Sequence, residues 1–177
     1  MKFFGHLKTI NKHRRLVRKF CFKCGLYWQG LTHDLSKYCH VEFSNGAKYY
    51  SDGSHSPIKD ERIDKGYSDA WLHHKSHNKH HSEYWMDFNF QERTYGPILI
   101  PNRYIGEMFC DRLAATMTYN GKNFKPQQVL DYLIERDGSP MHPQSKQKLR
   151  FLIELYITKG EKEVFAYIKK NMRNLER

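Results

Sequence analysis

Apolar residues recur at helical spacing along most of the chain, and few segments alternate between apolar and polar residues as strands do. The clearest case is residues 7–24, where Ile10, Val17 and Cys21 share one face and Gly25 provides a stop. Because this periodicity dominates, we expect a mainly α fold, a bundle of roughly six to eight helices.

Glycine, proline and polar residues divide the rest of the chain into further elements. Residues 26–35 are expected to form a short helix, and 44–57 a loop. The later predicted helices cover residues 58–84 with a break near Gly66, 103–117 after a capping Asn102, 125–136, 143–159 and 161–172. We expect one domain over 1–177, made of a metal-binding helical core (1–120) and a helical flank (121–177).

Histidines are numerous, and they gather in one segment. Of the eleven, five lie close together, at His73, His74, His77, His80 and His81. On a helix, His74, His77 and His81 would share one face, with His73 and His80 pointing elsewhere, although a half-turn shift of phase exchanges His80 and His81. Neutral imidazole is a common ligand of divalent metals, so this face is a candidate metal site.

Other helices offer matching groups on their inner faces. His13 lies on the apolar stripe of the first helix, His33 and Asp34 end the second, and Glu107 and Asp111 are spaced i, i+4 further on. A buried imidazole needs a partner, and a carboxylate on an inner face is costly unless a cation or a donor compensates it. The joint occurrence of these groups on successive helices favours a shared site.

The predicted metal ligands are therefore His13, His33, Asp34, His74, His81 and Asp111. This mixture of nitrogen and oxygen suits one or two ions of Mn, Fe, Zn, Co or Ni better than calcium. No thiolate joins the set, which argues against a structural zinc site. A packing network of hydrogen-bonded histidines, without metal, is the alternative in which the protein is purely structural.

The order of these residues resembles that of the HD superfamily of metal-dependent phosphohydrolases. In that superfamily a first His lies on one helix, an adjacent His-Asp pair follows on the next, and a later helix supplies a closing Asp. His13, His33, Asp34 and Asp111 occupy these places here. The resemblance implies an HD-like helical bundle and hydrolysis of a nucleotide or another phosphate ester. The resemblance is equally compatible with the activity of the di-iron oxygenases of the same superfamily.

The resemblance also implies roles for further residues. Superfamily members with two metals have additional histidines in between, a part that His74 and His81 could take. Residues 33–37 look like the HD-x-G-K form with Ser36 in place of Gly, which implies that Lys37 faces substrate phosphate.

Two residues of the later helix complete the predicted catalytic set with Lys37. Glu107 would orient a ligand histidine or a water molecule. Arg112 follows the predicted ligand Asp111 and would neutralise phosphate charge together with Lys37.

A second resemblance covers most of the chain. The segment from Trp71 to Trp85 looks like the Trp-x-x-His-x-x-x-Asn-x-His-His-x-Glu-Tyr-Trp pattern of a family of bacterial and phage proteins catalogued as a domain of unknown function. The name of that family implies no activity. Its members often have Trp where this chain has Arg112, and a basic residue there would favour an anionic substrate.

The charge of the chain bears on its partners. Lys and Arg number 30 and Asp and Glu 19, which gives a formal net charge of +11 and favours anionic partners. A phosphate-containing small molecule is the expected partner. A nucleic-acid-binding module with a structural metal is the alternative, since the first helix carries a basic face. No apolar run is long enough to span a membrane, and we expect a cytoplasmic protein.

Overall fold

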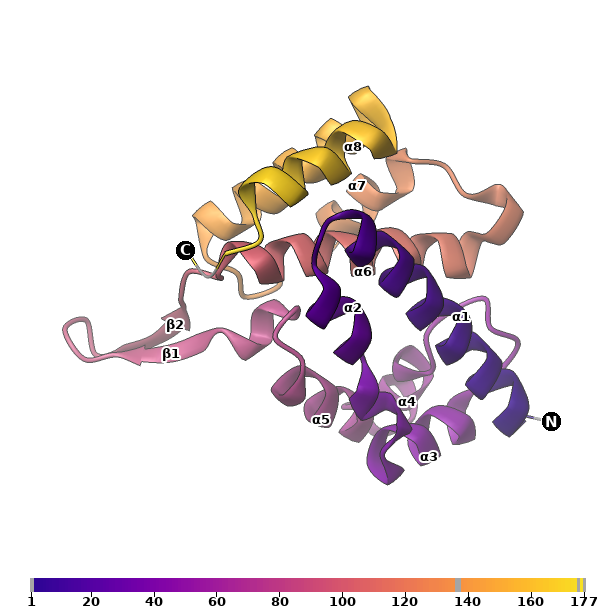
Figure 1. Cartoon of the computed structure of the whole chain (residues 1–177). Coiled ribbons are helices and arrows are strands. Elements are labelled where there is room, and N and C mark those ends of the chain that lie inside the picture. The colour runs from indigo at the N-terminus through magenta and orange to yellow at the C-terminus, as the bar shows by residue number, and fades with distance from the viewer. Residues whose placement is uncertain (1, 136–137, 175, 177) are drawn as a thin grey trace.

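The computed structural model describes residues 2–135, 138–174 and 176, and its described part is mainly helical, as the periodicity predicted. The α-helices are α1 (Lys2–Lys23), α2 (Tyr27–Thr32), α3 (His40–Tyr49), α4 (Pro57–Lys65), α5 (Asp69–His77), α6 (Asn102–Asn120), α7 (Gln127–Glu135) and α8 (Pro143–Asn171) (Figure 1). Short 3-10 turns are η1 (Leu35–Tyr38), η2 (Ser82–Tyr84) and η3 (Gly121–Asn123). The strands β1 (Met86–Asn89) and β2 (Thr94–Pro97) form an antiparallel hairpin.

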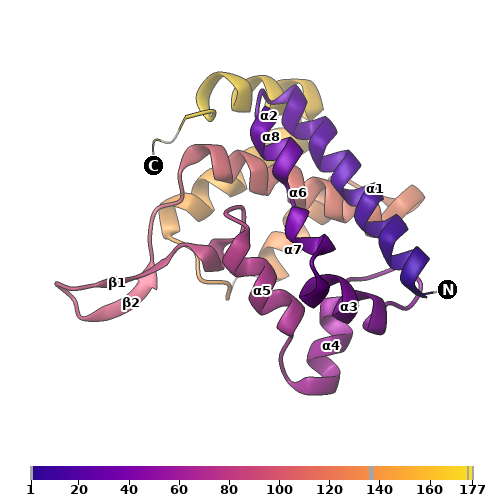
Figure 2. The same ribbon diagram turned by 60° about the horizontal axis from the view of Figure 1, so that its bottom comes forward.

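The helices form two groups that α1 joins. In one group α1 and α8 pack against α6, and α7 packs against α6 and α8. In the other α3 packs against α4, α5 and α1. The hairpin extends away from both groups (Figure 2). Among the described residues, no helix has both the length and the apolar content that crossing a bilayer requires.

The apolar core lies in the first group and includes the C-terminal segment. Leu152, Ile153 and Ile168 of α8 are fully buried beside Phe109 of α6 and Val17 of α1. Burying such side chains stabilises the fold by about 1.5–3 kcal/mol each. The residues predicted as a flank therefore share one core with α1 and α6.

Three of the four cysteines belong to this core. Cys21, Cys24 and Cys110 are buried free thiols, and the sulfur atoms of Cys24 and Cys110 lie 3.8 Å apart. The CxxC pair therefore packs as apolar side chains do.

Several predicted boundaries are wrong because local signals were outweighed by packing. The first part of the predicted loop over 44–57, up to Tyr49, belongs to helix α3, in which Gly46 allows the ring of His6 from α1 to approach closely. The helix predicted over 58–84 is interrupted at Gly66, as expected, between α4 and α5, but it stops at His77 instead of continuing to Tyr84. The hairpin that follows η2 was not predicted.

The remaining helices differ from prediction mainly at their ends. Asn102 is the first residue of α6, and Pro101 takes the capping position. The predicted helix over 125–136 corresponds to α7, although Arg136 lies outside the described residues. The two last predicted helices form the single element α8, which bends at Gly160, where φ is 81°.

Gly46→Ala should destabilise the protein even though alanine favours helices. A Cβ atom at this position would clash with Nε2 of His6, so either the His6 ring must move or the α1–α3 contact must open. We expect the free energy of unfolding to fall by about 1–3 kcal/mol, measured by urea denaturation. Gly96→Ala is the control, since its Cβ meets nothing within 4 Å. A stabilised Gly46→Ala variant would contradict this close contact.

Candidate metal centre

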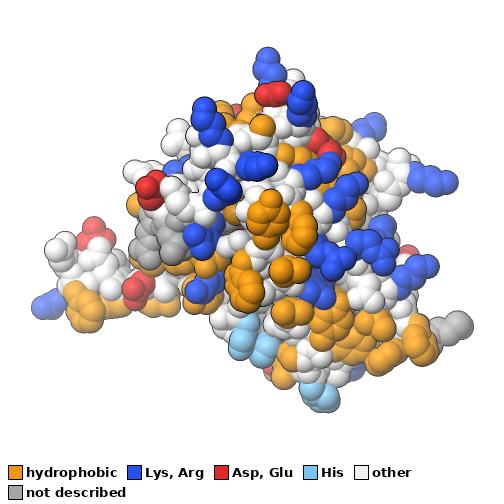
Figure 3. Space-filling model, in the orientation of Figure 1, with side chains coloured by type: hydrophobic (Ala, Val, Ile, Leu, Met, Phe, Trp, Pro, Cys, Tyr) orange, Lys and Arg blue, Asp and Glu red, His pale blue; other side chains and the backbone are white. Residues whose placement is uncertain are grey.

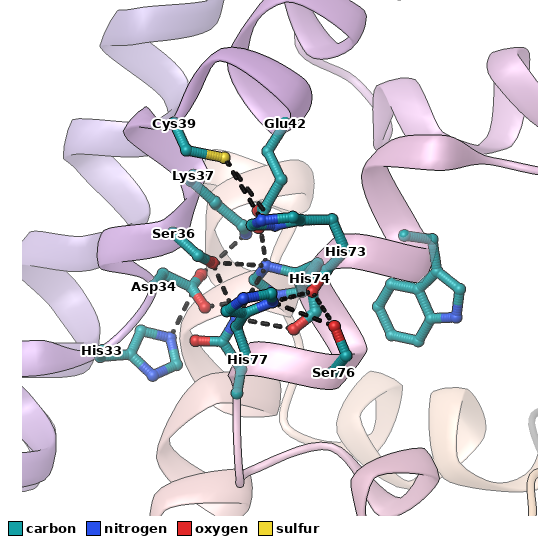
Figure 4. A network of polar contacts seen from close by, with 12 residues as sticks. His33, Asp34, Ser36, Lys37, Cys39, Glu42, His73, His74, Ser76 and His77 are labelled. Atoms are coloured by element: carbon teal, nitrogen blue, oxygen red, sulfur yellow. Dashed lines mark hydrogen bonds and ion pairs between the residues drawn. The ribbon is translucent and has the colours of Figure 1, made fainter.

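The centre is built around Asp34, which lies in a turn between α2 and η1. Its side chain is completely buried, and its backbone adopts the left-handed conformation with φ of 56°. Asp tolerates this conformation better than most residues. The predicted helix over 26–35 is wrong here, because α2 ends at Thr32. The turn lets the adjacent side chains of His33 and Asp34 both face the interior (Figure 4).

One group of side chains surrounds Oδ2 of Asp34. Nε2 of His13 and Nε2 of His33 each lie 3.4 Å from this oxygen. Oδ1 of Asp111 lies 3.0 Å from Nε2 of His13 and 3.4 Å from Nε2 of His33. These four residues come from α1, the Asp34 turn and α6, and their ligand atoms all lie within 4.8 Å of one another.

A second group surrounds the other oxygen of the same carboxylate. Nε2 of His74 and Nε2 of His80 each lie 3.3 Å from Oδ1 of Asp34. His81 completes this group, whose ligand atoms also lie within 4.8 Å of one another. Asp34 is therefore common to two sets of possible ligands, one on each side of its carboxylate.

Two further carboxylates hold the histidine rings from behind. Oε1 of Glu107 accepts hydrogen bonds from Nδ1 of His33 at 3.0 Å and Nδ1 of His80 at 3.1 Å. Oε2 of Glu42 accepts one from Nδ1 of His74 at 2.7 Å. A histidine that donates its Nδ1 proton in this way presents the lone pair of Nε2, which is the arrangement that metal sites use.

Three buried polar atoms at the centre lack a hydrogen-bond partner among the described residues. They are Oδ1 of Asp34, Nε2 of His80 and Nε2 of His81. The other oxygen of Asp34, Oδ2, forms an ion pair with Nζ of Lys37 at 2.7 Å. Leaving such atoms unsatisfied costs about 1–3 kcal/mol each, and a divalent cation between them would remove that cost. The donor set therefore fits a metal ion.

The charges of the centre also favour a bound cation. Burial alone would raise the pKa of Asp34, but His33 and Lys37 hold it well below its usual range. Burial would lower the pKa of His33, yet Asp34 and its other acidic neighbours raise it well above 6.5. Despite burial and the nearby His33, the carboxylates of Asp34 and Glu107 raise the pKa of His80 to about 9. Negative charge thus dominates this interior and attracts protons or a metal cation.

The structure brings all the predicted ligands into this centre: His13, His33, Asp34, His74, His81 and Asp111. It also adds His80, which we expected to point away. The helical phase used for that expectation does not apply, because α5 ends at His77 and Asn78 adopts an extended conformation. The N–H group of His81 then bonds the carbonyl of Asn78 at 3.1 Å, forming a turn that presents both His80 and His81 to Asp34.

Glu42 was also missed in the sequence, because its helix was not predicted. The three predicted catalytic residues differ in position. Lys37 contacts Asp34, and Glu107 lies behind the histidine rings. Arg112 is buried at the edge, with its guanidinium carbon 5.6 Å from the centre of the Tyr132 ring.

A small pocket gives access to the centre. It is about 30 Å³ in volume and is lined by residues of the centre and its edge, among them His80, His81, Asp111, Arg112, Tyr132 and Ser139. This volume holds about one or two water molecules. The side chain of Asp111 is 16% exposed and His81 is also partly exposed, so each of the two ligand groups has one member that borders this pocket.

Asp34→Asn should abolish metal binding at this centre. The amide keeps the shape of the side chain but cannot supply the negative charge that both ligand groups share. We expect the wild type to carry about one or two more transition-metal atoms per chain than the variant, measured by elemental analysis of untagged protein. Asp87→Asn, at an exposed position of the hairpin, should retain the wild-type content. Equal metal content in wild type and Asp34→Asn would refute the centre.

Glu107→Gln should weaken metal binding without removing a ligand. Glutamine keeps the shape but loses the charge that polarises His33 and His80. We expect the affinity to fall by about 10–100-fold, measured by competition with a coloured chelator. Glu92→Gln, in the exposed hairpin turn, is the matched control. An unchanged affinity in Glu107→Gln would show that the contact to the rings has only a packing role.

The chain matches the model of a known protein family. The model of a family of unknown function, DUF5662, matches residues 2–155, which include every residue of the centre. No curated protein and no solved structure matches the chain.

Proposed function

The chain belongs to the DUF5662 family, and for this member we propose a metal-dependent phosphohydrolase, an enzyme that cleaves a nucleotide or another phosphate ester with water. The observation that carries this proposal is the buried carboxylate of Asp34, which lies between two sets of nitrogen and oxygen ligands. The order of these ligands along the chain, which resembles that of the HD superfamily, supports the assignment to hydrolysis.

Each ligand group fits one borderline divalent ion. His13, His33, Asp34 and Asp111 would hold the first. The second group joins the same Asp34 to His74, His80 and His81. Ions of Mn, Fe, Zn, Co or Ni suit such donors. An ion held by these residues would lower the pKa of a water molecule toward neutrality and polarise a phosphoryl oxygen.

Two cationic side chains support a phosphate substrate. Burial would lower the pKa of Lys37, but Asp34 raises it above its usual value, so its ammonium group stays charged beside the centre. Arg112 borders the pocket that leads to Asp111. Together they would neutralise charge on the phosphoryl oxygens as the ester bond breaks. The small pocket admits water or a phosphoryl oxygen, and the remainder of a substrate would lie outside it.

The carboxylates behind the rings have a positioning role in this proposal. Glu107 and Glu42 keep Nε2 of the ligand histidines directed at Asp34 throughout the reaction. Because these carboxylates already hold the histidine rings by hydrogen bonds, substrate binding does not have to order the rings. Such preorganisation lowers the cost of reaching the transition state.

An iron-dependent oxygenase is the second candidate, because the same donors without sulfur suit two iron ions. Iron-specific oxygen consumption without phosphate release would favour it over hydrolysis.

A nucleic-acid-binding module gains less support from the contacts. Lys and Arg side chains are scattered over the face in Figure 3, with hydrophobic side chains between them. On α1, Arg14 donates to the carbonyl of His33 at 2.8 Å and to the hydroxyl of Tyr38 at 3.0 Å. Lys23 pairs with Glu161 at 3.1 Å. Part of the basic face expected on the first helix is therefore used inside the fold.

Lys37→Met should lower turnover of phosphate esters while metal stays bound. The variant removes the charge next to Asp34 but none of the ligands. We expect kcat/KM to fall by about 100-fold, measured as phosphate release from nucleotides and aryl phosphates with metal-loaded protein. Lys59→Met, at an exposed position of α4, should retain full activity. Absence of phosphate release by the metal-loaded wild type, across substrates and the five metals, would overturn the proposal.

A further inference from the structure

A second, chemically different cluster lies on the outer side of the centre, between α3 and α5. It consists of the thiol of Cys39, the carboxylate of Glu42 and the imidazole of His73 (Figure 4). Their ligand atoms lie within 4.8 Å of one another. We propose that this cluster is a separate, exchangeable site for a zinc-like divalent ion. The inference does not require the buried centre to be catalytic.

The distances are close to those of a tetrahedral site. Sγ of Cys39 lies 3.8 Å from Nδ1 and 3.9 Å from Nε2 of His73. Metal–sulfur and metal–nitrogen bonds of about 2.3 and 2.0 Å place the two atoms about 3.5 Å apart. Oε1 of Glu42 lies 2.7 Å from Nδ1 of His73, and this pair must widen by about half an ångström to admit an ion. Small side-chain rotations supply these changes.

The imidazole of His73 is already held in place. The ring of His77 stacks on it with centroids 4.0 Å apart and planes 14° from parallel. Nδ1 of His77 and the hydroxyl of Ser76 each donate a hydrogen bond to the backbone carbonyl oxygen of His73, at 2.8 Å. Less conformational entropy is therefore lost when this ring binds an ion.

The chemistry of the cluster fits a zinc-like ion. Cys39 is a free thiol that is partly exposed, whereas the other three cysteines are buried in the core. A thiolate and a carboxylate together balance the charge of a divalent ion, and the imidazole adds a neutral donor. Three protein ligands leave the fourth position of the ion to water, which permits exchange with solvent. The buried centre has no sulfur ligand and has a different donor set.

Glu42 connects the two sites. Its Oε2 accepts the hydrogen bond from His74 at 2.7 Å, and its Oε1 faces His73. One oxygen can therefore bind the outer ion while the other continues to hold the ring of His74. Both sites can be filled at the same time.

Titration of the full-length protein with Co²⁺ tests the outer site directly. A cobalt–thiolate bond gives an intense charge-transfer absorption in the near ultraviolet, which nitrogen and oxygen ligands do not give. We expect this absorption to rise until its intensity corresponds to one cobalt–thiolate bond per chain. It should disappear when Zn²⁺ is added and displaces the cobalt. Cys39→Ser should abolish the absorption, and Glu42→Gln should weaken cobalt binding at this site by at least tenfold.

His40→Ala is the matched control, because this exposed histidine neighbours Cys39 but lies outside the cluster. It should leave the absorption unchanged. Two results would overturn the inference. One is the absence of thiolate absorption in the wild type. The other is absorption that persists in Cys39→Ser, which would assign it to the core cysteines. Neither result bears on phosphate release, so the outer site and the proposed activity fail separately.

Discussion

Burial of the Asp34 carboxylate is the constraint on which the rest of this structure depends. A carboxylate without compensation in an apolar interior costs many kcal/mol, so the surrounding fold must supply positive charge. Lys37 supplies part of it from the next turn, and histidines from three other parts of the chain approach both oxygens. The packing of α1 on α6, and of α3 on α5, brings these groups together. The same contacts that build the bundle therefore build the site.

The centre is preorganised at two levels. The left-handed turn at Asp34 directs two adjacent side chains inward, which a continuous helix would not do. Behind the rings, Glu107 links His33 to His80, although the two histidines come from distant segments. Glu42 performs a comparable function for His74 and also reaches the outer cluster with Cys39. A carboxylate that holds a histidine raises its basicity as a ligand, so these contacts tune the site as well as position it.

The sequence predicted which residues gather around Asp34 better than how the segments that carry them are shaped. His13 on an apolar stripe and Asp111 on an inner face were recognisable, because periodicity reports which residues face the interior. His80 was not, because its orientation depends on a turn that begins where α5 ends, and helix ends are weakly encoded. The helix α3 was missed because Gly46 favours loops locally, whereas its close approach to His6 is a tertiary contact. The mainly α fold followed from the dominant helical period.

Anomalous diffraction from crystals of the protein grown with Mn²⁺ would show directly whether the carboxylate of Asp34 binds metal. We expect two anomalous peaks that flank this carboxylate, one beside His13, His33 and Asp111 and the other beside His74, His80 and His81. Crystals with full occupancy of Mn²⁺ elsewhere and no peak next to Asp34 would contradict this expectation. The histidines would then form a hydrogen-bonded packing network around a buried ion pair.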